Sequence, residues 1–366
     1  MSGKLFIGLM SGTSLDGVDA ALVKFDHPTE ASNPQVLYTH FVAYPEQLRT
    51  AILALQHPTH NELENTALIA NQLAELYATA VNQLLATNNV DKSTVTAIGC
   101  HGQTIRHRPE LGFTMQIGNA ALLAELTDVT VISDFRSRDI AAGGQGAPLV
   151  PAFHQALFSK ATLNRAIINI GGIANITYLN KNGTVIGFDS GPGNMLLDSW
   201  IKQHKNLNYD ANGSWASAGK IIPSLLEAML LEPYFKLSAP KSTGRDLFNL
   251  DWLNQFQIAA YLPEDVARTL VMLTALTIYQ AVTTGLPDEI YLCGGGAHNS
   301  LLKNDLQTLF VNIPVVTTEA LGIGVDWLEA IAFAWLACAC LNQQAANLPA
   351  VTGAKGPRIL GAIYQK

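Results

Sequence analysis

Apolar residues in this chain fall into short runs of the length of β-strands, separated by polar turns and by longer stretches with helical spacing. The segment Phe6–Phe25 carries two apolar runs around a turn rich in Ser, Gly and Asp, which predicts a β-hairpin. The segment Arg165–Leu179 has the same form around Gly171 and Gly172 and predicts a second hairpin. This repetition predicts two duplicated halves.

The remaining pattern alternates strands and helices. We expect strands over residues 36–44, 94–99, 113–117, 129–132, 185–188 and 289–293. We expect helices over residues 45–87 (broken near 57–61), 119–126, 194–204, 264–285 and 325–341, and another from residue 299 to 308. Residues 206–219, rich in Asn, Gly and Ser, are expected to form a loop. The alternation predicts an α/β fold, and 366 residues are enough for two domains.

Composition narrows the class of protein. Charged residues make up only 14% of the chain and hydrophobic ones 48%, with a net charge of −7 and no Lys/Arg cluster. This argues against nucleic acid or an anionic membrane as a partner. The longest apolar run, Ala330–Leu341, is too short to span a bilayer, and the amino terminus does not read as a signal peptide. Four cysteines in apolar segments predict reduced core thiols, so we expect a cytoplasmic protein.

The turn of the first hairpin is a candidate phosphate site. Backbone N–H groups and hydroxyls of such a turn can point at one spot, which suits a phosphate group. Taken alone, the turn would also fit an ordinary surface hairpin. The candidate residues are Ser11, Gly12, Thr13, Ser14, Asp16 and Gly17.

Asp189 follows an expected strand and opens a Gly-Pro-Gly turn, so it is our candidate general base. An aspartate that only stabilises its turn is the alternative. Gly294, Gly295 and Gly296 stand between a strand and a helix, where a ligand can approach the backbone closely. A plain tight turn would explain them equally well.

Polar residues collect at two further places. Asp134 and Arg136 belong to the polar stretch before the glycine run 143–146, and a planar guanidinium suits a substrate carboxylate. A solvated loop with internal ion pairs is the alternative. His101 and Gln103 follow another strand and could bind hydroxyls, although a lone histidine there is more often structural. Glu329 lies on an apolar helix and points either to its polar edge or into a cleft.

Familiar nucleotide and zinc motifs are missing. The sequence contains no GxxxxGK[ST], no GxGxxG after a strand, and no HExxH or CxxC pattern. A phosphate site here is therefore neither a P-loop nor a Rossmann turn, and a zinc held by the protein is not expected.

From residue 7 to the carboxyl terminus the chain resembles the anhydro-N-acetylmuramic acid kinase family. One departure is Ser190, where many members carry Thr; both supply a hydroxyl. The segments that carry the resemblance are Gly8–Asp19, Gly102–Thr104, Asp134–Arg136, Gly146–Pro148, Asn169–Asn175, Asp189–Asn194 and Cys293–Asn299.

The resemblance implies the duplicated, ribonuclease H-like fold of actin, hexokinase and Hsp70-type ATPases, with a cleft between the halves. It implies an ATP- and Mg²⁺-dependent enzyme of peptidoglycan recycling that opens the 1,6-anhydro ring of 1,6-anhydro-N-acetylmuramic acid and phosphorylates O6. Asp189 would activate the water and Glu329 would be the second catalytic candidate. Family members are usually homodimers.

The remaining site residues are assigned from the residue pattern together with the resemblance, and the contact of Arg136 with a substrate carboxylate is inferred from the pattern alone. Magnesium would arrive with ATP, with Asp16 as the nearest carboxylate, and no metal would be held by the protein alone. Phosphate or adenosine contacts are expected from Ser11–Gly17, Asp19, Gly171, Gly172 and Gly294–Gly296. Substrate contacts are expected from His101, Gln103, Asp134, Arg136, Gly193 and Asn194.

Two alternatives remain open at this stage. One is a sugar kinase of the same fold that phosphorylates an ordinary hydroxyl without opening a ring. The other, from a different class, is a nucleotide-gated chaperone or filament module. We expect an N-terminal domain over residues 1–135, joined by residues 343–366, and a C-terminal domain over residues 136–342.

Overall fold

The structure, a computed structural model, describes residues 3–12, 15–26, 34–58, 60–239, 241–282 and 285–366. Thr13 and Ser14 of the candidate phosphate turn lie outside the described residues. The chain divides into two compact units, residues 1–157 with 327–366 and residues 158–326. The limits expected from the sequence are 135/136 and 342/343, whereas the two units meet at 157/158 and 326/327.

The first unit is built on a mixed sheet whose described strands follow the order β13-β7-β4-β1-β2-β3. Strands β1, β2 and β3 are antiparallel neighbours, β4 and β7 run parallel to β1, and β13 adds an antiparallel edge. A separate antiparallel pair is formed by β5 and β6. The strands are β1 (Lys4–Met10), β2 (Gly17–Phe25), β3 (Gln35–Ala43), β4 (Val95–Cys100), β5 (Gln103–Arg108), β6 (Phe113–Ile117), β7 (Val131–Ser133) and β13 (Ala362–Tyr364).

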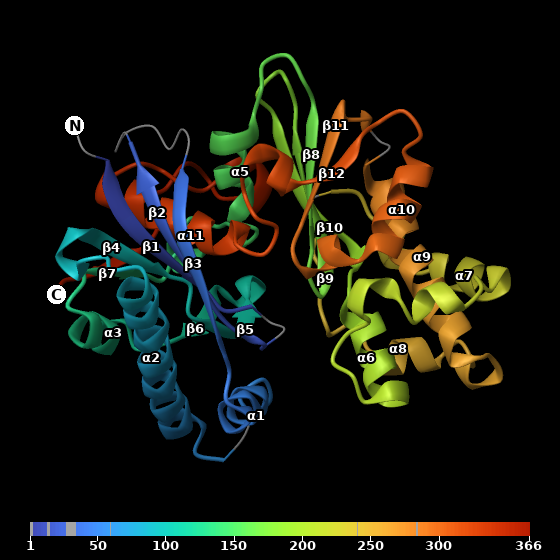
Figure 1. Cartoon of the computed structure of the whole chain (residues 1–366), viewed down its shortest axis with the longest axis horizontal. Helices are drawn as coiled ribbons and strands as arrows, with labels where there is room; N and C mark the ends of the chain where they lie inside the picture. Colours follow the sequence, from blue (N-terminus) through green and yellow to red (C-terminus); the bar gives the residue numbers. More distant parts are fainter. Residues whose placement is uncertain (1–2, 13–14, 27–33, 59, 240, 283–284) are drawn as a thin grey trace. The chain divides into compact units, whose positions relative to one another are not determined.

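Helices cover both faces of this sheet (Figure 1): α2 packs against β2 and β3, and α11 packs against β1, β2 and β4. Alternate strand residues such as Ile7 and Leu9 belong to the core on the α2 side. The α-helices outside residues 158–326 are α1 (Glu46–Ala54), α2 (Glu62–Thr87), α3 (Ala120–Thr127), α4 (Ser137–Ala141), α11 (Leu328–Leu341) and α12 (Pro349–Thr352), while α5 (Val150–Phe158) crosses the unit boundary.

The second unit has its own sheet, in the order β10-β9-β8-β11-β12. Strands β8, β9 and β10 are antiparallel neighbours, and β11 and β12 run parallel to β8. The elements are β8 (Arg165–Ile170), β9 (Ile173–Leu179), β10 (Val185–Pro192), α6 (Met195–Lys205), α7 (Pro223–Leu230), α8 (Leu250–Asn254), α9 (Pro263–Val282), β11 (Glu289–Cys293), α10 (Ser300–Leu309) and β12 (Val315–Thr317).

The two sheets share one plan. In each, three antiparallel strands are followed by two strands parallel to the first, and helices fill the connections. This order is that of a ribonuclease H-like fold, so the prediction of a duplicated α/β architecture is confirmed. The predicted core thiols are also confirmed, because all four cysteines are buried and none forms a disulfide. In the described part of the chain no helix is both long and apolar enough to cross a membrane.

Several predicted elements differ from the structure at their ends. The predicted helical region 45–87 is two helices, α1 and α2, broken where expected. The strand predicted to end at residue 188 continues to Pro192, because a bulge between Asp189 and Gly191 restores pairing with β9. Asp189 therefore lies inside a strand rather than after it. Strand β5 was not predicted, because only Gln103 and Ile105 of its residues are buried and its polar side chains hide the pattern.

Two glycines let α11 lie directly on the first sheet. A Cβ on Gly8 would overlap the backbone carbonyl of Ala330, and a Cβ on Gly99 would overlap that of Phe333. The helix is buried along nearly its whole length, and the small side chain of Ala337 faces Gly99 of β4. The absence of side chains at two strand positions therefore sets the distance between helix and sheet.

We expect Gly8→Ala to destabilise the first unit, because its methyl must displace the α11 backbone. Overpacking of this kind costs about 1–3 kcal/mol. Thermal or urea unfolding measures the change. The control is Gly285→Ala, whose methyl would lie 3.5 Å from the Tyr178 hydroxyl in ordinary contact. A Gly8→Ala protein as stable as the control would contradict the prediction.

Candidate active site

Three glycine-containing turns meet at one end of the second sheet. Gly193 N–H donates to the Gly172 carbonyl at 2.9 Å, and Asn194 N–H donates to the Gly171 carbonyl at 2.8 Å. A Cβ on Gly296 would overlap the side chain of Ile170, the last residue of β8. The structure therefore brings together the predicted residues of the Gly171–Gly172 turn, Gly193, Asn194 and the Gly294–Gly296 segment.

The Gly171–Gly172 turn leaves room for a ligand. A Cβ on Gly172 would come no closer than 3.5 Å to Met195, and one on Gly171 would lie 3.7 Å from the Ile173 carbonyl. Neither glycine has a positive φ, so alanine could adopt both conformations. The fold itself does not require glycine at these two positions. Close approach of a ligand to the backbone is a reason that remains.

Asp189 lies on β10, four residues before Gly193. Its Oδ2 accepts the Thr243 N–H at 3.0 Å, and its own N–H donates to the Lys241 carbonyl at 3.1 Å. The Tyr234 hydroxyl donates to the Asp189 carbonyl at 2.8 Å. Among the described residues no hydrogen bond ends on Oδ1. Oδ2 of the carboxylate is thus fixed by a hydrogen bond, whereas Oδ1 can still accept one from a ligand or a water molecule.

Burial raises the pKa of Asp189 to about 6. The Thr243 N–H and the positive charge of Lys241 oppose this shift but do not cancel it. Lys241 does not form an ion pair with the carboxylate; its Nζ donates to the Tyr234 carbonyl at 3.1 Å and lies 4.6 Å from the Tyr234 ring centre. A carboxylate with a pKa near 6 is ionised at neutral pH and is a stronger base than an exposed aspartate.

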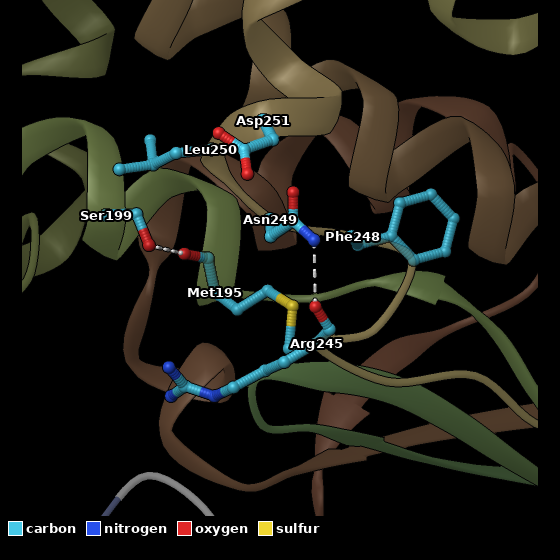
Figure 2. A pocket seen from close by; sticks show the side chains of 7 residues that line it. All are labelled: Met195, Ser199, Arg245, Phe248, Asn249, Leu250 and Asp251. Atoms are coloured by element: carbon cyan, nitrogen blue, oxygen red, sulfur yellow. Dashed lines mark hydrogen bonds between the residues drawn. The ribbon is translucent and has the colours of Figure 1, made fainter. Parts of the chain in front are cut away.

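A pocket of about 290 Å³ adjoins these turns (Figure 2). Met195, which faces Gly172, lies on one side, and the exposed Arg245 supplies a positive charge. No site was predicted in this region, although the polar run 241–246 is a signal in a chain with few charges. The lining residues are Met195, Ser199, Arg245, Phe248, Asn249, Leu250 and Asp251.

The first unit brings together residues around the first hairpin turn. The Ser11 hydroxyl is 2.7 Å from the Tyr77 hydroxyl and donates to the Gly102 carbonyl at 3.0 Å. Gln103 Nε2 donates to the Gly12 carbonyl at 3.2 Å. The side chain of Ser11 is therefore engaged inside the unit, and phosphate binding by this turn stays a prediction that rests on its backbone. Gly17 allows β3 to approach, because its Cβ would overlap the Val42 carbonyl.

His101 and Arg136 form a second group. Arg136 Nε and Nη2 lie 3.2 and 2.9 Å from His101 Nε2, and Nη1 donates to the Gly146 carbonyl at 2.8 Å. Burial, with the guanidinium beside it, lowers the pKa of His101 to about 3, so the ring is neutral and accepts from Arg136. Burial also raises the pKa of Glu329, and Arg136 opposes that shift. The structure thus groups three predicted residues.

Asp139 has a structural role that the sequence did not reveal. Its fully buried carboxylate accepts the Gly146 N–H at 2.8 Å, Asn347 Nδ2 at 2.6 Å and the Thr352 hydroxyl at 2.8 Å. These bonds join the glycine run to the carboxyl-terminal segment. They also fix Gly146, whose carbonyl accepts the hydrogen bond from Arg136 Nη1.

Other predicted residues have different surroundings. Asp16 is exposed, and Asp19 lies on β2 opposite Phe41 of β3. Asp134 is exposed, accepts the Ser137 N–H at 3.3 Å, and lines a cavity with residues of the β13 segment. Nothing in these contacts assigns a ligand to the three carboxylates.

Two sheets of one plan, with glycine turns at a strand end and a carboxylate of raised pKa near them, fit a phosphotransferase. A family model described as anhydro-N-acetylmuramic acid kinase matches residues 4–366. The chain belongs to this family and is a sugar kinase.

Curated relatives agree along the whole length. The anhydro-N-acetylmuramic acid kinase of Nitrosomonas europaea is 53% identical over 363 residues, covering 98% of this chain and 99% of the relative. That of Nitrosospira multiformis is 51% identical over 368 residues and covers both chains completely. That of Pseudomonas fluorescens is 50% identical over 364 residues, covering 98% of this chain and 99% of the relative.

Proposed function

We propose that this kinase uses ATP and water to convert 1,6-anhydro-N-acetylmuramic acid into N-acetylmuramic acid 6-phosphate and ADP, a step of peptidoglycan recycling. The observation that carries the proposal is Asp189: a carboxylate held through Oδ2, open at Oδ1, with a pKa of about 6, close to turns that can receive phosphates. An ordinary hydroxyl acceptor needs one proton removed. An anhydro sugar also needs an activated water.

The proposed chemistry runs as one sequence. Asp189 removes a proton from a water molecule while the water oxygen bonds to the anomeric carbon, and the bond from that carbon to O6 breaks. O6 then attacks the γ-phosphorus, the bond to the β-phosphate oxygen breaks, and ADP leaves. The proton taken by Asp189 is released to solvent. Catalysis of this kind rests on position and electrostatics rather than on a covalent intermediate.

The phosphates would be held by backbone N–H groups. The Gly171–Gly172 turn has space for them, and the Ser11–Gly17 turn and Asp19 would also contact phosphate. Gly294–Gly296 would face the adenosine part. Magnesium would arrive with ATP and neutralise phosphate charge. Exposed Asp16 has the oxygen donors that Mg²⁺ prefers.

The sugar would be bound by polar side chains and backbone groups. Neutral His101 and Gln103 would contact hydroxyl groups, and the N–H groups of Arg136 that are not directed at His101 or Gly146 would meet the lactyl carboxylate. Glu329, whose protonated form is favoured by burial, would be the second catalytic group. Asp134, Gly193 and Asn194 would complete the substrate contacts.

Cellular setting and assembly are part of the proposal. An enzyme that consumes ATP would act in the cytoplasm, where ATP is made. The family resemblance supports a homodimer and small-molecule substrates, with no nucleic acid or membrane partner.

Gly172→Ala should weaken ATP use, because the new methyl fits the fold but occupies the space of a phosphate. We expect KM for ATP to rise about tenfold, equivalent to roughly 1.4 kcal/mol, with an unchanged thermal midpoint. Steady-state kinetics measures the change, and Gly285→Ala is the matched control. Equal KM values in the two variants would contradict a phosphate at this turn.

Asp189→Asn should remove turnover while keeping the shape of the site. We expect kcat to fall about 10²–10⁴-fold, with KM for both substrates changed little. In the wild-type protein kcat/KM should decline as the pH falls below about 6, where the carboxylate becomes protonated. Near-normal kcat in the variant would remove Asp189 from the mechanism and leave Glu329 as the candidate base.

Stability separates this role from a structural one. The pKa of Asp189 is higher in the folded chain than its ordinary 3.8, so ionisation between pH 3.8 and about 6 costs folding stability as the pH rises. Asparagine carries no such cost. At pH 8 the thermal midpoint of Asp189→Asn should equal or exceed that of the wild type, whereas a turn stabiliser would give a lower midpoint.

A further inference from the structure

The segment that follows residue 240 is fixed against the candidate base. Lys241 accepts the Asp189 N–H at 3.1 Å, and Thr243 donates its own N–H to Asp189 Oδ2 at 3.0 Å. These two bonds extend the edge of β10 by a short stretch of chain. They fix the backbone of Thr243 beside the carboxylate.

The hydroxyl of Thr243 makes no hydrogen bond with the described part of the chain. Its Oγ1 is buried and has no hydrogen-bond partner among the residues that the structure describes. Leaving a buried polar group unsatisfied destabilises a fold, and valine of the same shape would avoid this penalty. An orphaned hydroxyl at a functional site therefore indicates a missing partner.

The Asp189 carboxylate can also accept a further hydrogen bond. The backbone of Thr243 occupies Oδ2, while Oδ1 accepts no hydrogen bond from the described residues. One residue thus anchors the carboxylate by its main chain and carries a buried hydroxyl that has no partner among the described residues. A water molecule can bridge two such groups, since it offers two donors and two acceptors.

We propose that the Thr243 hydroxyl positions the water that Asp189 activates, which makes Thr243 a water-positioning residue for the ring-opening step. The inference rests on the proposed function. The water donates one O–H to Asp189 Oδ1 and is held at its oxygen, or through its second O–H, by Thr243 Oγ1. Thr243 takes no proton in the net reaction and forms no bond to the sugar. It restricts the direction from which the water approaches the anomeric carbon.

The decisive variant is Thr243→Val, which keeps the backbone N–H to Asp189 and removes only the hydroxyl. We expect kcat for the anhydro sugar to fall about 10- to 100-fold, with KM for ATP and sugar within twofold of wild type. The acid limb of kcat/KM near pH 6 should stay in place, because the Thr243 N–H still reaches Oδ2. Thr243→Ser should recover most of the rate. These readouts distinguish a water-positioning role from a structural one.

A matched control is available in the same unit. Thr318 is fully buried, and its Oγ1 also has no partner among the described residues. Thr318→Val therefore makes the same chemical change away from Asp189, and kcat should remain within twofold of wild type.

The outcomes separate the two proposals. Wild-type turnover of the anhydro sugar together with an unimpaired, folded Thr243→Val protein would overturn the role of Thr243 and leave the proposed function intact. A loss of rate that Ser does not recover, with a lowered thermal midpoint, would also overturn it. No wild-type turnover of the anhydro sugar would overturn both.

Discussion

The tight packing of α11 on the sheet at Gly8 and Gly99 is the constraint on which the first unit depends. A side chain at either glycine would collide with the helix backbone, so the helix lies in direct contact with the backbones of β1 and β4. That position sets Glu329, in the first turn of α11, near Arg136, and places Phe333 against the His101 ring at a centroid distance of 4.7 Å. The surroundings of Glu329 and His101 therefore depend on the apolar contact between α11 and the sheet.

In the second unit the important constraint is the burial of the Asp189 carboxylate. Asp189 loses water contact and gains only one N–H and a distant cation in return, which is why its pKa rises. Full neutralisation by Lys241 would have lowered the pKa and weakened the base. The Lys241 ammonium instead binds the Tyr234 carbonyl and lies over the Tyr234 ring, close enough to help keep Asp189 ionised at neutral pH.

The sequence was sufficient for the sheets, because hairpins and strand-to-helix junctions leave periodic, local signals. It also singled out Asp189 and the glycine turns, whose roles as base and phosphate site stay predictions. It could not reveal Thr243, whose importance comes from a hydrogen bond across 54 positions. Nor could it show that the Ser11 hydroxyl is engaged by Tyr77. Contacts between segments far apart in the sequence determine these roles, and the local sequence pattern does not reveal such contacts.

The central claim is that one enzyme adds both a phosphate and a water to its sugar. The direct measurement is the composition of the product formed from 1,6-anhydro-N-acetylmuramic acid and ATP in ¹⁸O-labelled water, stopped early and read by mass spectrometry. The account predicts a product heavier than the substrate by one phosphoryl group and one water, with the label on the anomeric oxygen and none in the phosphate. A product that gains the phosphoryl group alone, with the anhydro bridge intact and no label, would contradict it.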